Sequence, residues 1–152
     1  TFTSMTPFLF ASGTNNYSAY GQQLNTDIYC LKLGTGSVSG SFTTGVLKVS
    51  GSKKLSFYAV TWKGKKATVS IKVNNGGSIS GNTSIEPVAN DGATGTGNPP
   101  YTIVFSDDTD YYTFNLTGLT ESSTISIATD ESFETAASNS NARAIMCGFQ
   151  LY

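Results

Sequence analysis

The residues of this chain best suited to chemistry are a single tryptophan and the cations beside it. Trp62 is the only Trp, and it ends a run of alternating apolar residues directly before Lys63, Gly64 and Lys65. A flat aromatic ring beside ammonium groups is suited to a sugar, because the apolar face of the sugar stacks on the ring while its hydroxyls bond the polar groups. The alternative is that Trp62 caps the edge of the apolar core, and the sequence leaves both interpretations open.

Three tyrosines and one arginine are candidates for the same ligand surface. Tyr17 and Tyr20 lie in a polar segment, and Tyr101 follows the sequence GTGNPP. Tyrosine at a strand end is also ordinary packing, so each has a structural alternative. Arg143 is the only Arg and precedes the last apolar run. Its planar guanidinium is suited to a carboxylate, to a sugar hydroxyl or to the backbone of the preceding loop.

A short acidic cluster is the candidate metal site. Asp107, Asp108 and Asp110 lie within the sequence SDDTD, and carboxylate oxygens are ligands that calcium prefers. The same residues are typical of a solvated turn, and the twelve-residue calcium loop with its glycine and final glutamate is absent. Asn25 and Asp27 form a second, weaker set of oxygen ligands. A structural calcium ion is therefore an expectation that competes with an ordinary turn.

The composition argues against catalysis. The chain contains no His, which excludes Ser-His and Cys-His nucleophilic sites and imidazole metal ligands. Glycoside hydrolysis needs two carboxyl groups facing each other in a cleft, whereas the acidic residues of this chain gather in turn-like segments. We therefore expect no enzymatic activity.

The two cysteines allow a long-range covalent link. Cys30 and Cys147 each lie in an apolar segment, near the two ends of the chain. A disulfide between them fits an oxidising environment. Two buried thiols that pack as small apolar residues fit the same sequence equally well.

The segments that must position these residues follow strand periodicity. Runs rich in Thr, Val, Ile, Tyr and Phe are separated by Gly, Asn, Ser and Asp, which is typical of an all-β protein. Two alternating runs, residues 54–61 and 67–73, are joined by five residues and predict a β-hairpin. Further strands are predicted at residues 3–10, 27–33, 37–42, 45–49, 78–86, 101–105, 111–116, 123–128 and 142–152.

Three connections are longer than a hairpin turn: residues 11–26, 87–100 and 129–141. If successive strands alternate in direction, the first two emerge beside the Trp62 turn and the third emerges at the opposite end. On the same assumption, residues 74–77 and 106–110 lie at that opposite end. The C-terminal run is too apolar for a frayed end, so we expect it to pair inside a sheet near the N-terminal strand.

Length and charge limit the function classes further. The 152 residues fit one domain. Charged residues make up 12% of the chain, against roughly 25% in an average soluble protein, which suits a secreted β protein. A formal net charge of −1 offers no basic surface for nucleic acid or anionic membranes, and no apolar run approaches the roughly 20 residues that span a bilayer. The chain starts at Thr1 without a signal-peptide pattern, so we expect a mature or trimmed segment.

The order of the segments LKLG, KKLSFYAVTWKGKKATVSIKV, DYYTFNLTGLTESSTISIAT and NARAIMCGFQLY resembles that of the galactose-binding-domain-like β-jelly-rolls. These include carbohydrate-binding modules of secreted bacterial polysaccharide-degrading proteins. The resemblance covers most of the chain as a pattern, and the matching positions are Trp62, Gly64, Tyr112, Phe114, Leu116, Gly118, Leu119 and Arg143. It implies a two-sheet antiparallel sandwich, often with a structural calcium ion and a glycan site in the loops at one end.

These observations predict an all-β, antiparallel two-sheet β-sandwich of jelly-roll type that comprises residues 1–152. The predicted function is a non-catalytic carbohydrate-binding module of a secreted or cell-surface bacterial protein. Its partner is a polysaccharide or oligosaccharide, with no nucleic acid and no membrane insertion, and the domain is a monomer or part of a larger chain. The alternative is a structural or adhesive jelly-roll that docks to protein. The predicted ligand contacts are Trp62, Lys63, Lys65, Tyr17, Tyr20, Tyr101 and Arg143.

Overall fold

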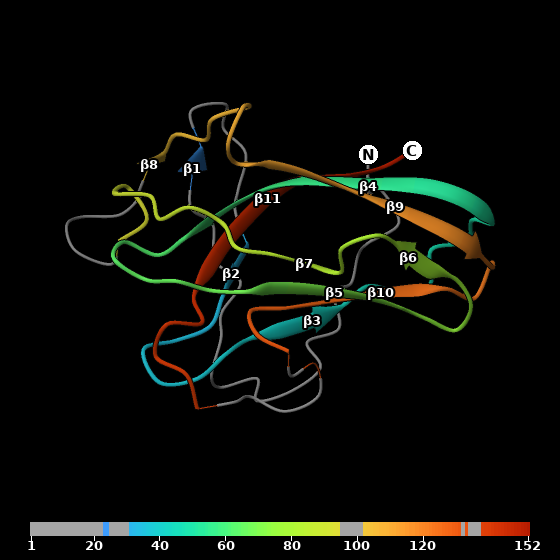
Figure 1. The fold of residues 1–152 in the computed structure, drawn as a ribbon, viewed down its shortest axis with the longest axis horizontal. Coiled ribbons are helices and arrows are strands. Elements are labelled where there is room, and N and C mark those ends of the chain that lie inside the picture. The colour runs from blue at the N-terminus through green and yellow to red at the C-terminus, as the bar shows by residue number, and fades with distance from the viewer. Residues whose placement is uncertain (1–22, 25–30, 95–101, 132, 134–137) are drawn as a thin grey trace.

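The computed structural model describes residues 23–24, 31–94, 102–131, 133 and 138–152. These residues form two packed antiparallel sheets, which Figure 1 shows edge-on, with β4, β9 and β11 in one layer and β3, β5 and β10 in the other. This arrangement confirms the predicted all-β sandwich. Within the described residues, no helix is long and apolar enough to cross a membrane.

The larger sheet has five strands. Their order is β2 (Leu31–Leu33), β11 (Ala144–Leu151), β4 (Gly51–Thr61), β9 (Tyr111–Leu119) and β6 (Ser78–Ser80). The smaller sheet has the order β3 (Ser41–Thr43), β10 (Thr124–Ala128), β5 (Val69–Asn74) and β7 (Ser84–Ile85). A separate parallel pair consists of β1 (Gln23–Leu24) and β8 (Thr102–Ile103). The C-terminal run pairs with both β2 and β4, which confirms that it lies inside a sheet.

Consecutive strands lie in opposite sheets, from β2 through β7 and again from β9 through β11. The predicted hairpin of residues 54–61 and 67–73 is therefore wrong, because β4 and β5 belong to different sheets. Residues 62–68 are a crossover between the layers. The alternation of apolar residues fixes which side chains enter the core, and this pattern is satisfied equally when two strands face each other across the core.

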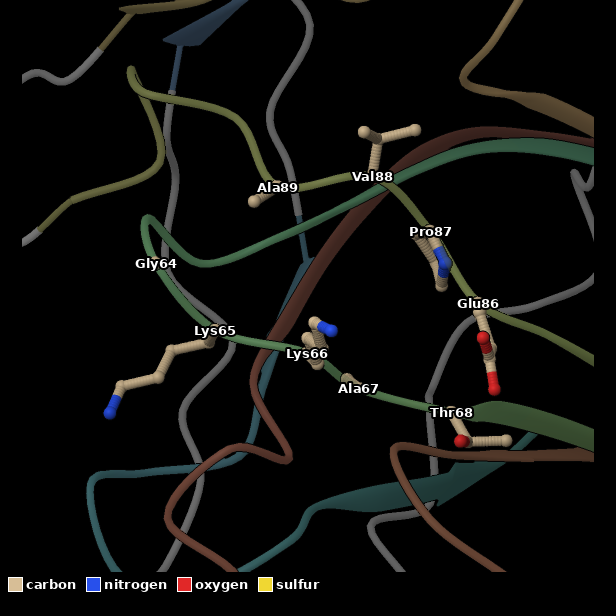
Figure 2. A pocket seen from close by; sticks show the side chains of 9 residues that line it. All are labelled: Gly64, Lys65, Lys66, Ala67, Thr68, Glu86, Pro87, Val88 and Ala89. Atoms are coloured by element: carbon tan, nitrogen blue, oxygen red, sulfur yellow. The ribbon is translucent and has the colours of Figure 1, made fainter.

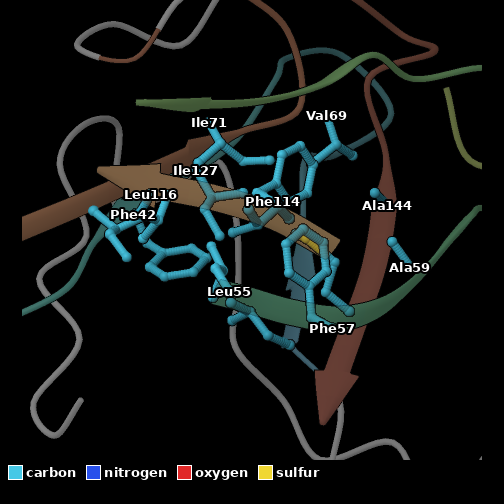
Figure 3. Close-up of a cluster of buried hydrophobic side chains, with 14 of the residues drawn as sticks. Phe42, Leu55, Phe57, Ala59, Val69, Ile71, Phe114, Leu116, Ile127 and Ala144 are labelled. Carbon is cyan, nitrogen blue, oxygen red and sulfur yellow. The ribbon is translucent and has the colours of Figure 1, made fainter. Parts of the chain in front are cut away.

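The main core fills the space between the sheets, as Figure 3 shows. The Phe57 ring is central: it stacks on Phe114 at a centroid distance of 5.7 Å and contacts Phe149 at 5.0 Å. Aliphatic side chains from both layers, such as Leu55 and Ile71, complete the packing. Because these residues alternate along their strands, the neighbouring side chains of the same strands must point outward.

A second apolar cluster covers part of the outer face of the five-stranded sheet. Val60 and Ile145 point to this outer face, and residues 86–94 and 102–110 pack over them through side chains such as Ile103. The covering segment is tied to the end of β4, since the Thr61 amide donates to the Val88 carbonyl at 3.0 Å. The rest of the outer face, towards the beginning of β4, carries no such cover among the described residues. Among the described residues, this half of the sheet face is open.

The predicted distribution of loops between the two ends is partly wrong. β10 ends at Ala128 opposite Ser70, near the start of β5, and the Trp62 amide donates to the Arg143 carbonyl at 3.1 Å. The segment after β10 therefore returns at the Trp62 end, as does the turn before Tyr111. Two wrong strand assignments explain the error. Residues 45–49 form no strand, and residues 78–86 split into β6 and β7 around Gly81, which has a φ of +92°.

Candidate functional site

The open half of the five-stranded sheet presents tyrosine, hydroxyl and amide side chains in rows. Phe114 and Leu116 of β9 enter the core, so Tyr111, Thr113 and Asn115 alternate to the outer face. Their cross-strand partners on β4 are Tyr58, Ser56 and Lys54; β11 adds Gln150, and Tyr152 directly follows β11. We call this surface the tyrosine face; it comprises Lys54, Ser56, Tyr58, Tyr111, Thr113, Asn115, Gln150 and Tyr152.

Two stacked tyrosines occupy one end of the tyrosine face. The rings of Tyr58 and Tyr111 lie 4.8 Å apart between centroids, tilted by 48°. The Tyr58 hydroxyl donates to Asp107 Oδ1, and this hydrogen bond, together with burial, raises the pKa of Tyr58 to about 12. Tyr58 is thus held as a neutral support, whereas Tyr111 is 36% exposed. The Tyr111 ring is the one that a ligand can reach.

A hollow of about 360 Å³ lies at the other end of the tyrosine face. It is lined by Ser52, Lys53, Lys54, Asn115, Leu116, Thr117 and Tyr152. Tyr152 is 56% exposed, and its backbone pairs with Lys54 through two hydrogen bonds of 2.7 and 3.0 Å. Its hydroxyl lies 3.1 Å from Ser56 Oγ, which in turn lies 2.8 Å from Thr113 Oγ1. The Tyr152 ring is therefore held in place by its hydroxyl as well as by its backbone.

This arrangement suits a chain of sugar rings. Tyr111 and Asn115 are four residues apart on one strand, a distance of roughly 13 Å at about 3.3 Å per residue. An oligosaccharide of that length meets an exposed ring at one end, the exposed Thr113 hydroxyl in the middle, and an amide, an ammonium and a second ring at the other. Apolar stacking surfaces with a few placed polar groups are typical of such sites.

Trp62 lies away from the tyrosine face, beyond the covering segment. It is half-buried and packs against the second apolar cluster. Two cations contact its ring: Lys32 Nζ lies 4.8 Å and Arg143 Cζ lies 5.5 Å from the ring centroid. Burial, and then the charge of Arg143, lower the pKa of Lys32 to about 8, and its ammonium donates to the Gly34 carbonyl at 2.7 Å. These contacts fit the alternative in which Trp62 caps the edge of the core.

The other predicted ligand residues are only partly brought together. Arg143 joins Trp62, and its Nε is buried without a hydrogen-bond partner in the part of the chain that the structure describes. Lys63 is exposed and its amide donates to the Ala93 carbonyl at 2.6 Å. Lys65 is half-buried and lines a separate groove. Tyr17, Tyr20 and Tyr101 lie outside the described residues.

The groove beside Lys65 has a volume of about 550 Å³ and lies between residues 64–68 and 86–89 (Figure 2). It forms where β7 ends. From there residues 86–89 diverge from β5, the partner of β7, and reach the end of β4, where Ala89 pairs with Thr61. Figure 2 shows the Glu86 carboxylate directed towards Thr68, while Lys65 points away from the facing segment. None of the residues that line the groove is aromatic, so it offers no ring on which a sugar can stack.

The acidic turn is engaged in its own hydrogen bonds. Asp110 is 5% exposed and accepts from the Ser106 amide at 2.8 Å and from Thr109 Oγ1 at 3.1 Å. Asp107 accepts from Tyr58, and Asp108 is exposed. Among the described residues, no three His, Cys, Asp or Glu side chains are grouped to hold a metal ion. These contacts match the turn alternative; calcium binding by the three aspartates stays a prediction.

The cysteine pairing also stays a prediction. Cys147 is buried on the outer side of β11 within the second apolar cluster. Cys30, like Asn25 and Asp27, lies outside the described residues.

Tyr58, Tyr111 and Tyr152 were not among the ligand residues predicted from the sequence. A signal for Tyr111 was present, because Tyr111, Thr113 and Asn115 alternate with apolar residues over the predicted strand 111–116. A strand with one polar, tyrosine-bearing face predicts an open sheet face as directly as it predicts a strand. Tyr152 carries no comparable signal, since its position depends on the pairing of β11 with β4.

Comparison with known proteins reveals similarity of fold only. The CBM35 domain of Abf62 from Cellvibrio japonicus is 11% identical, with a TM-score of 0.41 over 95% of this chain and 88% of that chain. The N-terminal cellulose-binding domain of β-1,4-glucanase C from Cellulomonas fimi is 15% identical, with a TM-score of 0.40 over 97% of this chain and 95% of that one. The K2 cleaved adhesin domain of Lys-gingipain is 8% identical, with a TM-score of 0.40 over 96% and 98% of the two chains.

No protein-family model and no curated protein matches the chain. The solved structures with a similar fold thus include a CBM35 domain, a cellulose-binding domain and an adhesin domain.

Proposed function

We propose that this protein is a non-catalytic glycan-binding domain that holds a polysaccharide or oligosaccharide on the tyrosine face. The observation that carries the proposal is the exposure of Tyr111 and Tyr152, 36% and 56%, on one sheet face whose remaining side chains are hydroxyls, amides and a lysine. Sugar rings present an apolar face and a polar rim, and this surface offers both a stacking partner and hydrogen-bond partners.

The site is rigid before it binds. Tyr111 is supported by Tyr58, which is fixed by Asp107, and Tyr152 is held through Lys54 and Ser56. A preformed surface loses little conformational entropy on binding, yet a flat site buries little ligand area. We therefore expect weak binding per site, with Kd between about 1 µM and 1 mM.

The Trp62 end, with Lys63, Lys65 and Arg143, is the alternative location for the glycan site. Its support is the exposure of Lys63 and the partial exposure of the Trp62 ring. The cations that already contact the indole make it the weaker candidate. A secreted or cell-surface bacterial setting belongs to the same proposal, and it is supported by the low content of charged residues in the chain.

Protein docking is the alternative function, and one surface favours it. Val88 and Val104 are 56% and 61% exposed, and Asn90 Nδ2 joins their segments by donating to the Val104 carbonyl at 2.9 Å. Exposed aliphatic side chains on neighbouring segments suit an apolar contact. A jelly-roll that docks through this surface needs no sugar site.

Isothermal titration with soluble polysaccharides tests the proposal. Tyr111→Ala removes the stacking ring and is expected to weaken binding about tenfold, whereas Tyr111→Phe keeps the ring and is expected to bind like the wild type. Lys65→Ala serves as the control for the groove, and a thermal melt establishes that each variant is folded. Equal binding by Tyr111→Ala and the wild type, or no glycan binding by the folded wild type, would overturn the proposal.

A further inference from the structure

We propose that the glycan held on the tyrosine face is anionic, and that Lys54 contacts its acidic groups. The inference rests on the proposed function and names the class of its ligand. The acidic group is an oxyanion, either a carboxylate or a sulfate ester, repeated along the polymer.

The first observation is the charge of the hollow. Among the described residues, its lining contains two lysines and no Asp or Glu, although acidic residues outnumber basic ones in the chain, 10 to 9. The groove at the other end differs, because Glu86 lies among its lysines. The hollow is thus a locally cationic site on a protein whose net charge is −1.

The second observation is the placement of Lys54. It is exposed on the tyrosine face, directly opposite Asn115, and its backbone is hydrogen-bonded to Tyr152. Lys53 also lines the hollow, but it is paired with the core residue Leu116, so its side chain leaves the opposite face of β4. A sugar ring that contacts Tyr152 therefore lies beside Lys54.

The third observation concerns the partners of Lys54. Within the described residues, no carboxylate forms an ion pair with it. Its charge is therefore balanced by solvent ions, which an anionic polymer displaces when it binds. One exposed ion pair contributes little, so it is expected to favour a charged polymer over its neutral counterpart by up to about fivefold.

Matched polymers separate charge from sugar identity. One pair is polygalacturonate and its fully methyl-esterified form, which differ in the carboxylate; the other is dextran sulfate and dextran, which differ in the sulfate. The wild type is expected to bind the charged member of at least one pair more tightly, and the preferred pair identifies the oxyanion. Raising the salt concentration from about 0.05 to 0.5 M is expected to remove most of this preference, because Lys54 is exposed.

Variants then assign the preference to Lys54. Lys54→Gln is expected to lose the preference while it still binds the neutral polymer, and Lys66→Gln, which changes an exposed lysine at the other end, is expected to keep it. Equal affinity for both members of both pairs, or an unchanged preference in Lys54→Gln, overturns the inference alone. Absence of binding to every polymer, charged or neutral, overturns the proposed function.

Discussion

Replacement of Trp62 by alanine separates the two roles of this residue. The ring packs on the second apolar cluster and contacts Lys32 and Arg143. Truncation of a fully buried Trp costs about 3–5 kcal/mol, and each cation contact adds about 0.5–1 kcal/mol. Because Trp62 is half-buried, we expect Trp62→Ala to lower the free energy of unfolding by about 2–4 kcal/mol.

The assay is a thermal or urea melt followed by circular dichroism. For a domain of this size, 1 kcal/mol corresponds to roughly 2–4 °C, so Tm is expected to fall by about 5–15 °C. Trp62→Phe keeps an aromatic ring in the same place and is expected to lose less than half as much stability. Glycan binding by the folded Trp62→Ala protein, measured below its Tm, is expected to equal that of the wild type.

The opposite pattern would refute this reasoning. A Trp62→Ala protein that loses less than about 1 kcal/mol of stability but loses its glycan binding would make Trp62 the stacking platform. The sugar site would then lie at the Trp62 end, where the sequence alone first placed it.

Three further substitutions test the packing that positions the site. Folding lowers the pKa of Lys32 from 10.5 to about 8, so it releases the Lys32 proton in this window, and the stability of the wild type is expected to rise as the pH increases from about 8 towards 10.5. Lys32→Met is expected to abolish this rise. Urea melts of both proteins over this pH range test it, and an equal response of the two would contradict it. Gly34→Ala places a Cβ 1.9 Å from the Ala142 carbonyl oxygen at a φ of +84°. It is expected to lower the free energy of unfolding by over about 2 kcal/mol, as measured by a thermal melt. Gly36→Ala, whose Cβ meets nothing within 4 Å, is the control. Phe57→Ala removes the central ring of the main core and is expected to cost about 3–5 kcal/mol by urea titration; a loss below about 1 kcal/mol would show that this core is not cooperative.

The strands of this chain could be predicted because the alternation of apolar and polar residues within each short segment indicates which side chains are buried. Leu55 and Phe57, like Val69 and Ile71, alternate with outward residues, and all four enter the main core as their alternation indicates. What the alternation cannot encode is the partner of each strand. Residues 62–66 are short enough for a hairpin, yet they join strands of opposite sheets, and this choice depends on contacts across the whole core.

The candidate site was predicted less well for the same reason. Trp62 was predicted as a ligand contact because it is the only Trp of the chain. Its role, however, depends on Lys32 and on the covering segment, which are distant from it in the sequence. The tyrosine face is likewise built from three parts of the chain: Tyr111 lies on β9, Tyr58 lies on β4, and Tyr152 directly follows β11. Only strand pairing brings these rings to one surface.

Glycan binding by the tyrosine face is the central claim, and one comparison tests it most directly. The wild type and the double variant Tyr111→Ala/Tyr152→Ala are run in native gels that contain a panel of soluble neutral and acidic polysaccharides, alongside thermal melts of both proteins. At least one polysaccharide is expected to retard the wild type and to leave the folded double variant unretarded. Free migration of the wild type through every gel, or equal retardation of the two proteins, would contradict the claim.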